Sequence, residues 1–171
     1  PAVVIAKRNM DEFETPRQVA VQRLAHRLAT HVVAVSENVA GSSVALGVPR
    51  ERVTVIANGV DVDRFGAHAA DRTLLGVTGP APVVGSVGCL AARKDHGTLL
   101  QALARVRAGG HEFEAVIVGD GPEHERLQAQ ARSLGLERVV RFLGERPDIE
   151  RLLPGMDVFV LSSREEGIPN A

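Results

Sequence analysis

A stretch of small residues followed by two cations, at positions 85–95, has the composition of an anion-binding turn. A β-branched run ends near Gly88, and Arg93 and Lys94 follow where a helix is expected to begin. Backbone amides at such a turn can approach an anion closely, and a cation at ~4 Å adds a few kcal/mol at an effective dielectric near 20. The competing interpretation is a solvated charge pair at a helix entrance, with Asp95 as the partner of Lys94.

Two further turns follow apolar runs and carry acidic side chains. The turn at 119–123 departs from the Gly-x-Gly-x-x-Gly nucleotide fingerprint because its sixth position is His124, and its acidic residues would repel a phosphate. We therefore expect a structural turn near the site, with backbone contact to a ligand left open. In the turn at 162–169, the Glu166 carboxylate could accept hydrogen bonds from sugar hydroxyls or balance developing positive charge. A solvated acidic loop is the alternative.

Other side chains with metal-binding or partner-binding chemistry lack the required spacing. Asp61 and Asp63 have no third ligand nearby, and the six histidines show no ligand spacing, so no metal site is expected. The single cysteine, Cys89, excludes an internal disulfide framework. A net charge of −1 and the absence of Trp and Tyr argue against a nucleic-acid-binding protein. The basic face formed by Arg17, Arg23 and Arg27 with His26 is either solvated or in contact with an anionic membrane or acceptor.

The elements that must position these turns alternate between strands and helices. Thr15 and Pro16 signal a helix start, and Val21, Leu24 and Leu28 share one helix face. The alternation predicts βαβ units and parallel sheets, interrupted once at about 58–81. The expected strands are 2–6, 31–36, 53–57, 82–87, 113–118, 139–143 and 157–161, and the expected helices are 15–29, 36–47, 95–109 (capped by Asp95), 121–135 and 148–153.

An ordered set of segments resembles the nucleotide-sugar glycosyltransferases of family 4, also called group 1. The resemblance implies an α/β fold of two Rossmann-like parallel-sheet domains, both incomplete here: the C-terminal part of an acceptor-side domain at 1–57, a linker at 58–81, and the N-terminal part of a donor-binding domain at 82–171. The matching segments are 31–36, 55–61 with Phe65, 87–90 with Lys94, 116–122, 140–144, and 157–163 with Glu166 and Gly167.

The family resemblance also implies roles for individual residues on the donor side. Lys94 matches the lysine that binds the donor diphosphate, in the same loop as Gly88. Cys89 stands where many members have an arginine that shares this task, and Arg93 could substitute for it only if its side chain turns inward.

Three more positions carry implied contacts with the donor. Glu166, followed by Gly167, matches the first glutamate of a Glu-x7-Glu pair that contacts the donor sugar, and the second glutamate would fall beyond Ala171. Leu143 and Gly144 match the loop that frames the nucleobase. Lys94 and Glu166 are the expected catalytic residues, and we expect them to lie on the same side of the sheet.

The resemblance implies a retaining glycosyltransferase that moves a sugar from a UDP- or GDP-sugar to the hydroxyl of a small-molecule or lipid-linked acceptor. We expect no cofactor, no metal and no nucleic-acid partner. We expect a cytoplasmic location, and peripheral contact with the inner face of the membrane is left open. Because the chain starts at Pro1 and stops just after a turn, we expect an internal fragment that is inactive alone. The alternatives are a nucleotide-sugar epimerase on the same architecture and a non-catalytic nucleotide- or sugar-binding protein.

Overall fold

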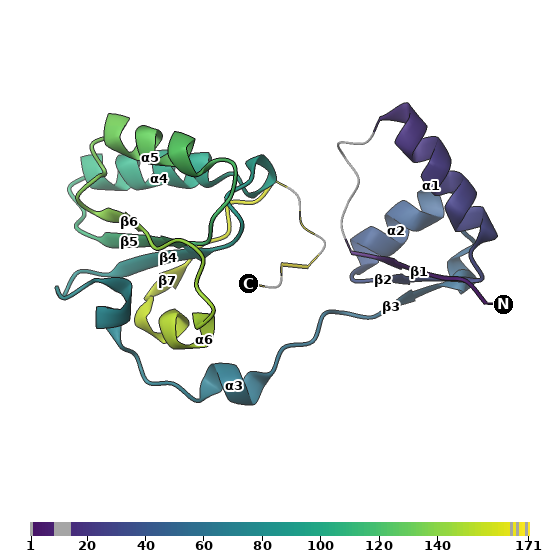
Figure 1. The fold of residues 1–171 in the computed structure, drawn as a ribbon, viewed down its shortest axis with the longest axis horizontal. Helices are drawn as coiled ribbons and strands as arrows, with labels where there is room; N and C mark the ends of the chain where they lie inside the picture. The colour runs from purple at the N-terminus through teal and green to yellow at the C-terminus, as the bar shows by residue number, and fades with distance from the viewer. Residues whose placement is uncertain (1, 9–14, 165, 167, 170) are drawn as a thin grey trace. The chain divides into compact units, whose positions relative to one another are not determined.

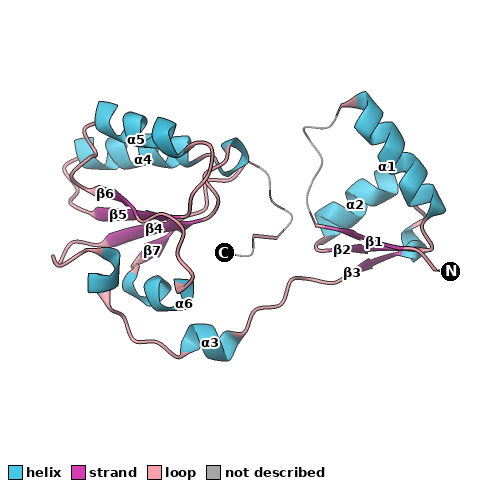
Figure 2. Cartoon of the chain, in the orientation of Figure 1, coloured by secondary structure: helices cyan, strands magenta, loops and turns pink. Residues whose placement is uncertain are grey.

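The computed structural model describes residues 2–8, 15–164, 166, 168–169 and 171. The chain divides into two compact units, residues 1–60 with 165–170, and residues 61–164 with 171. Strands and helices alternate in both units, and each unit contains one parallel sheet (Figures 1 and 2). The expected α/β class with two parallel sheets is therefore confirmed.

The described part of the first unit is a three-stranded sheet with two helices. Its strands follow the order β1-β2-β3, with Val4 opposite His31 and Val32 opposite Val53. The buried core lies between the sheet and the helices and includes Val32 and Val39. The elements are β1 (Val4–Lys7), α1 (Pro16–Leu28), β2 (His31–Ala34), α2 (Glu37–Ala45), the 3-10 helix η1 (Arg50–Arg52) and β3 (Val53–Val55).

Helix α1 begins as predicted but buries an unexpected side. Thr15 forms a capping box with Gln18, which satisfies backbone amides at the helix start. The apolar face at Val21, Leu24 and Leu28 is exposed, with relative accessibilities of 68%, 60% and 71%. His26 is buried instead, and its Nδ1 donates to the carbonyl of Gln22 at 2.8 Å. The apolar spacing identified a helix face but not the face that meets the sheet, and the assignment of His26 to a solvated basic face was wrong.

The second unit contains a parallel sheet whose strand order reverses at β4. The order is β6-β5-β4-β7, so the chain runs outward from β4 to β6 and then returns to place β7 on the other side of β4. The sheet elements are β4 (Val83–Val87), β5 (Glu114–Val118), β6 (Val140–Phe142) and β7 (Val158–Phe159), joined through the 3-10 helix η3 (Ala92–Lys94), α4 (His96–Ala108), α5 (His124–Ser133), α6 (Ile149–Leu152) and the 3-10 helix η4 (Leu153–Gly155).

Both faces of this sheet are covered, which explains its continuous apolar strands. Helices α4 and α5 lie on one face and α6 on the other (Figure 1). Along β5, Ile117 belongs to the core beneath α4 and α5, whereas Val116 and Val118 belong to the core on the opposite face. Because successive side chains of a strand point to opposite faces, a strand covered on both sides needs apolar residues at every position.

The segment expected to connect the two domains, 58–81, contains two short elements of the second unit. These are α3 (Val62–Gly66), where the Asp61 side chain accepts the amide of Arg64 at 3.0 Å, and the 3-10 helix η2 (Arg72–Leu75). Arg72 donates to both carboxylate oxygens of Asp157, at 2.8 and 2.7 Å. Elements of five and four residues are too short to show a periodic pattern, so sequence analysis found none here.

Candidate functional site

The carboxyl ends of β4 and β7 flank the point at which the strand order of the second unit reverses. In open α/β sheets, ligands commonly bind outside the carboxyl ends of the strands at such a switch point. The turn at 85–95 leaves β4 at this point, and the segment 160–164 leaves β7 beside it. The topology therefore selects this edge of the sheet as the candidate site.

Glycine residues hold the neighbouring loops close together at this edge. The amide of Gly88 donates to Val118 at 2.9 Å, and the amide of Gly119 donates to Gly144 at 2.7 Å. A Cβ on Gly119 would overlap the carbonyl oxygen of Gly88 and lie 2.8 Å from its carbonyl carbon. The φ of Gly119, +128°, is also one that side-chain-bearing residues rarely adopt. The loops after β4, β5 and β6 thus pack backbone against backbone.

Lys94 lies at the end of this turn, in η3, and is half-buried. Its side chain extends over Gly88: a Cβ built on that glycine would lie 3.7 Å from Lys94 Cε and 4.0 Å from Nζ. The ammonium group therefore lies next to the glycine turn at the end of β4. Arg93 and Cys89 are both exposed, so Lys94 is the more buried of the two adjacent cations.

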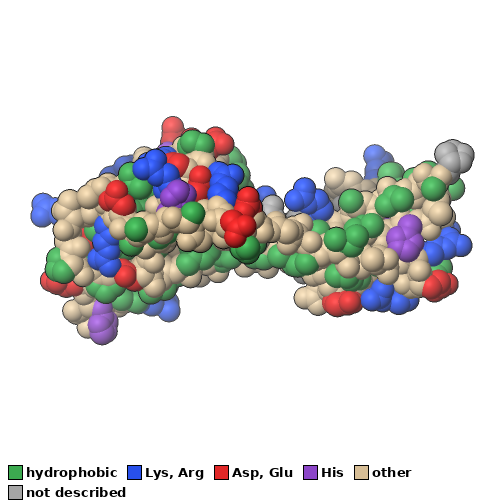
Figure 3. All heavy atoms as spheres, turned by 90° about the horizontal axis from the view of Figure 1, so that it is seen from below, with side chains coloured by type: hydrophobic (Ala, Val, Ile, Leu, Met, Phe, Trp, Pro, Cys, Tyr) green, Lys and Arg blue, Asp and Glu red, His purple; other side chains and the backbone are tan. Residues whose placement is uncertain are grey.

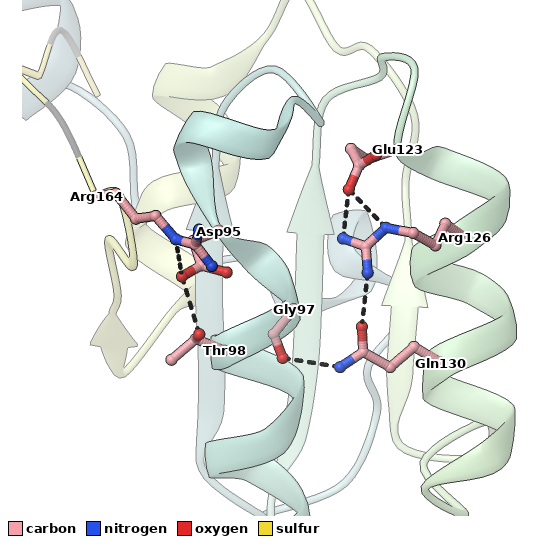
Figure 4. A network of polar contacts seen from close by, with 7 residues as sticks. All are labelled: Asp95, Gly97, Thr98, Glu123, Arg126, Gln130 and Arg164. Atoms are coloured by element: carbon pink, nitrogen blue, oxygen red, sulfur yellow. Dashed lines mark hydrogen bonds and ion pairs between the residues drawn. The ribbon is translucent and has the colours of Figure 1, made fainter. Parts of the chain in front are cut away.

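The segment after β7 is hydrogen-bonded to the turn that carries Lys94. Ser162 Oγ donates to the carbonyl of Lys94 at 3.0 Å, and the amide of Arg164 donates to the carbonyl of Arg93 at 2.9 Å. The guanidinium Nε of Arg164 donates to Asp95 Oδ2 at 2.8 Å (Figure 4). The two loops that flank the switch point are thereby fixed against each other.

Asp95 has a different role from the predicted one. It is the residue before α4, but its side chain makes no capping bond to the helix amides, and it accepts from Arg164 and from the Thr98 hydroxyl instead. The hydrogen bond from Arg164 keeps the pKa of the Asp95 carboxyl below its ordinary value. Asp95 is therefore the partner of Arg164, and it is not paired with Lys94 in the way that the alternative interpretation required.

His96 is a buried imidazole directly after this turn. Its exposed fraction is 3%, and its Nδ1 has no hydrogen-bond partner among the residues that the structure describes. Burial lowers the pKa of His96, and the nearby charge of Lys94 lowers it further. Both effects favour the neutral form of the imidazole beside Lys94.

The acidic side chains of the turn at 119–123 interact with residues of the same turn and of α5. Asp120 Oδ1 accepts from the amide of Gly121 at 2.7 Å and is 2.8 Å from His124 Nδ1. The hydrogen bond with His124 lowers the pKa of the Asp120 carboxyl. Glu123 forms an ion pair with Arg126. These acidic groups are thus occupied within the turn and at the start of α5.

The remaining predicted residues lie at two places. Leu143 and Gly144 directly follow β6 and are half-buried, with the Leu143 amide donating to Ile117 at 2.9 Å. Glu166 is half-buried and falls in the stretch that groups with the first unit, so its expected meeting with Lys94 stays a prediction. Gly167 lies outside the described residues.

Sequence analysis missed the contributions of Ser162 and Arg164. A hydroxyl and a guanidinium directly after a strand were a usable signal. The sequence does not show that this strand pairs with β4, about 70 residues earlier. Only that pairing brings Ser162 and Arg164 next to the turn that carries Lys94.

Three further observations concern the described residues as a whole. Within the described ranges, no group of three or more His, Cys, Asp or Glu side chains is placed to hold a metal ion. A search of the same residues finds no helix with the length and apolar character needed to cross a membrane. On the face shown in Figure 3, acidic and basic side chains are interspersed.

Comparison with known proteins finds relatives among glycosyltransferases and solved structures of similar fold. The chain is 35% identical to the glycosyltransferase EpsF of Bacillus subtilis over 124 residues, 70% of this chain and 32% of the relative. It is 30% identical to the 2-deoxystreptamine glucosyltransferase of Streptomyces kanamyceticus, over 92% of this chain and 43% of the relative. The Anabaena protein HepE, solved with UDP and glucose, superimposes with a TM-score of 0.82 at 29% identity, over 95% of this chain and 46% of that chain.

The chain therefore spans between about a third and a half of the length of these relatives. Two family models divide it between them. A model for glycosyltransferase family 4 matches residues 7–64, and one for glycosyl transferases group 1 matches residues 81–171, which contain the glycine turn, Lys94 and the segment after β7. With more than half of its length matched by the second model, the chain belongs to the group 1 glycosyltransferases.

Proposed function

We propose that the complete protein is a retaining glycosyltransferase that moves a sugar from a UDP- or GDP-sugar to an acceptor hydroxyl. The observation that carries this proposal is the half-buried Lys94 over Gly88 at the switch point of a parallel sheet. Family membership supports the reaction class, and the solved HepE complexes with UDP and with UDP-glucose favour a UDP-linked donor.

The chemical task of the site is to manage charge. As the bond to the sugar breaks, the leaving diphosphate gains negative charge and the anomeric carbon becomes oxocarbenium-like. The Lys94 ammonium is in a position to stabilise the diphosphate beside the amides of the glycine turn, including that of Cys89. Because Lys94 is half-buried, its attraction for an anion is less screened than that of the exposed Arg93.

The sugar and the base would be held by the residues around this centre. Glu166, followed by Gly167, would accept hydrogen bonds from the donor sugar and offset positive charge at the anomeric carbon. Leu143 and Gly144 would frame the nucleobase at the end of β6. The side chain of Lys94 does the work that a divalent ion does in other transferases, so we propose a reaction that needs no metal or further cofactor.

We further propose a small-molecule or lipid-linked acceptor and a cytoplasmic enzyme with peripheral membrane contact. Helix α1 supports the last point, because it exposes the apolar Val21, Leu24 and Leu28 on a helix that also carries Arg17, Arg23 and Arg27. Exposed apolar and basic side chains on one helix are typical of helices that lie on anionic lipid surfaces.

A panel of labelled UDP- and GDP-sugars tests the reaction in the complete protein. Transfer to an acceptor, with the anomeric configuration of the donor kept in the product by NMR, is the expected result. An altered sugar still attached to the nucleotide would instead identify an epimerase, and tight binding without turnover would identify a binding protein.

Lys94→Ala tests the proposed role of the ammonium group. We expect turnover to fall at least ~10²-fold, the scale of one lost charge-stabilising group. Arg105→Ala is the matched control, because it removes an exposed cation from the last turn of α4, the helix that follows the turn carrying Lys94. An unchanged rate in Lys94→Ala, or an equal loss in both variants, would remove Lys94 from the mechanism.

A further inference from the structure

The residue after Lys94 adopts an unusual backbone conformation. Asp95 has φ 48° and ψ 41° and is the one non-glycine residue with positive φ in the part of the chain that the structure describes. This left-handed conformation is unfavourable for a residue with a side chain, although Asp tolerates it better than most. Such a conformation persists where surrounding contacts hold it, and it is often found at functional sites.

The contacts that hold Asp95 come from the segment after β7. Three hydrogen bonds from Ser162 and Arg164 reach the consecutive residues Arg93, Lys94 and Asp95, at 2.9, 3.0 and 2.8 Å in that order. The bond to Asp95 is an ion pair, and the two side chains differ in burial: Asp95 is 16% exposed and Arg164 is 64% exposed. The less exposed carboxylate thus anchors the end of a mostly exposed arginine.

Thr98 fixes the carboxylate from the other side. Its hydroxyl donates to the same oxygen, Asp95 Oδ2, at 2.9 Å (Figure 4). The carboxylate oxygen of Asp95 that accepts from Arg164 is therefore also held by a residue of α4, so Asp95 is a preorganised partner for Arg164. Arg164 is the last residue of the second unit before the stretch that contains Glu166.

We propose that Arg164 is a positioning residue for sugar transfer. Through its ion pair with Asp95, it fixes the segment after β7 against the Lys94 turn, and it thereby limits the position of Glu166, two residues later in the chain. This inference rests on the proposed function. Two residues of extended chain span at most about 7 Å, so fixing Arg164 confines Glu166 to a small region. Small displacements of a reacting group cost large factors in rate, even when binding is retained.

A second arginine near this contact provides a matched control. Arg126 on α5 also forms an ion pair, with Glu123, and its side chain is 57% exposed, close to the value for Arg164. It also contacts Gln130, which donates to the carbonyl of Gly97 at 3.0 Å (Figure 4). Arg126 therefore links α5 to α4 through Gln130, and its side-chain hydrogen bonds go to Glu123 and Gln130, not to residues 93–95.

The test compares Arg164→Ala with Arg126→Ala in the complete protein. Hydrogen exchange followed by mass spectrometry should show at least tenfold faster exchange over 162–164 in Arg164→Ala only. The reason is that the variant loses the side-chain ion pair with Asp95, which holds the amide of residue 164 in its hydrogen bond to the carbonyl of Arg93. We expect kcat to fall at least tenfold, while the Kd for UDP, which lacks the sugar, stays within twofold of the wild-type value. Arg126→Ala should leave kcat within twofold.

Asp95→Asn separates the ion pair from other effects of losing the arginine. Asn tolerates the left-handed conformation and keeps an oxygen for Thr98, but it removes the charge. If the pair acts as a unit, the double variant with Arg164→Ala should be no slower than Arg164→Ala alone. Additive losses would mean that the two residues act separately, and this result would overturn the proposal.

Unchanged exchange over 162–164, a kcat within twofold of wild type, or an equal loss in Arg126→Ala would also overturn it. A fall in UDP affinity parallel to the fall in kcat would do the same, because it would indicate general disruption of the site. Failure of the proposed function looks different: the wild-type protein would transfer no sugar, or Lys94→Ala would be fully active. Normal turnover in Arg164→Ala beside an inactive Lys94→Ala variant would refute the positioning role alone.

Discussion

The close contact between Gly119 and Gly88 predicts that Gly119→Ala destabilises the second unit strongly. A methyl group at Gly119 would overlap the carbonyl oxygen of Gly88 and lie 2.8 Å from its carbonyl carbon. Ordinary contacts lie at about 3.5–4.0 Å, so one strand end must move by about 1 Å. Strain at φ +128° costs about 1–3 kcal/mol and overpacking about 1–3 kcal/mol, which together predict a loss of about 2–6 kcal/mol.

Gly144→Ala provides the matched control for this prediction. Gly144 also has positive φ, +66°, and follows the neighbouring strand, but no described atom lies within 4 Å of a Cβ built there. Its substitution should therefore cost only the left-handed strain, about 1–2 kcal/mol. Thermal unfolding of the complete protein measures both. Because each kcal/mol corresponds to about 2–4 °C in a domain of roughly 150–250 residues, the melting temperature should fall further in Gly119→Ala than in Gly144→Ala.

The result that would refute the reasoning is an equal loss of stability in the two variants. It would mean that the loops after β4 and β5 do not pack backbone against backbone as described. A second measurement follows from the position of Gly88 under the Lys94 side chain. If the methyl group displaces Gly88, turnover in Gly119→Ala should fall by a larger factor than in Gly144→Ala, when both are assayed well below their melting temperatures.

Two further predictions concern other parts of the second unit. Gly85→Ala should cost about 1–3 kcal/mol by urea denaturation, because the three atoms nearest to the new methyl group all belong to the flexible Met156 side chain, which can move; a loss as large as that of Gly119→Ala would contradict this. Burial lowers the pKa of His96, so the unfolded chain takes up a proton at this residue at a higher pH, about 6.5, than the folded chain does. The free energy of unfolding should therefore fall as the pH drops below about 6.5, by at most about 1.4 kcal/mol per pH unit. His96→Gln should flatten this decline between pH 6.5 and 5, and parallel profiles for the two proteins would show that another group is responsible.

Local patterns in the sequence predicted most elements of both units. The helix expected at 95–109 is α4 at His96–Ala108, and the strand expected at 113–118 is β5 at Glu114–Val118. Capping residues, glycine stops and β-branched runs act over a few residues, so they can be read without the fold. The same information failed for α1, where the buried side depends on which side chains find partners against the sheet.

The candidate site was only partly predictable. Lys94 stood out by its place after a glycine turn, and the ordered motifs identified the family. The partnership of Asp95 with Arg164 joins residues 69 positions apart, and neither residue carries a local signal for the other. It forms because β7 pairs with β4, which brings two loops that are distant in the chain to the same edge of the sheet.

The sequence by itself therefore determined the α/β alternation, the positions of the glycine turns and the family. Only the tertiary structure decided the strand order β6-β5-β4-β7, the switch point beside Lys94 and the contacts that hold Asp95 in its left-handed conformation. The physical reason is one of range. Turns, caps and periodicity depend on neighbours a few residues away, whereas the side of β4 on which β7 settles depends on how all helices and strands together bury their apolar faces.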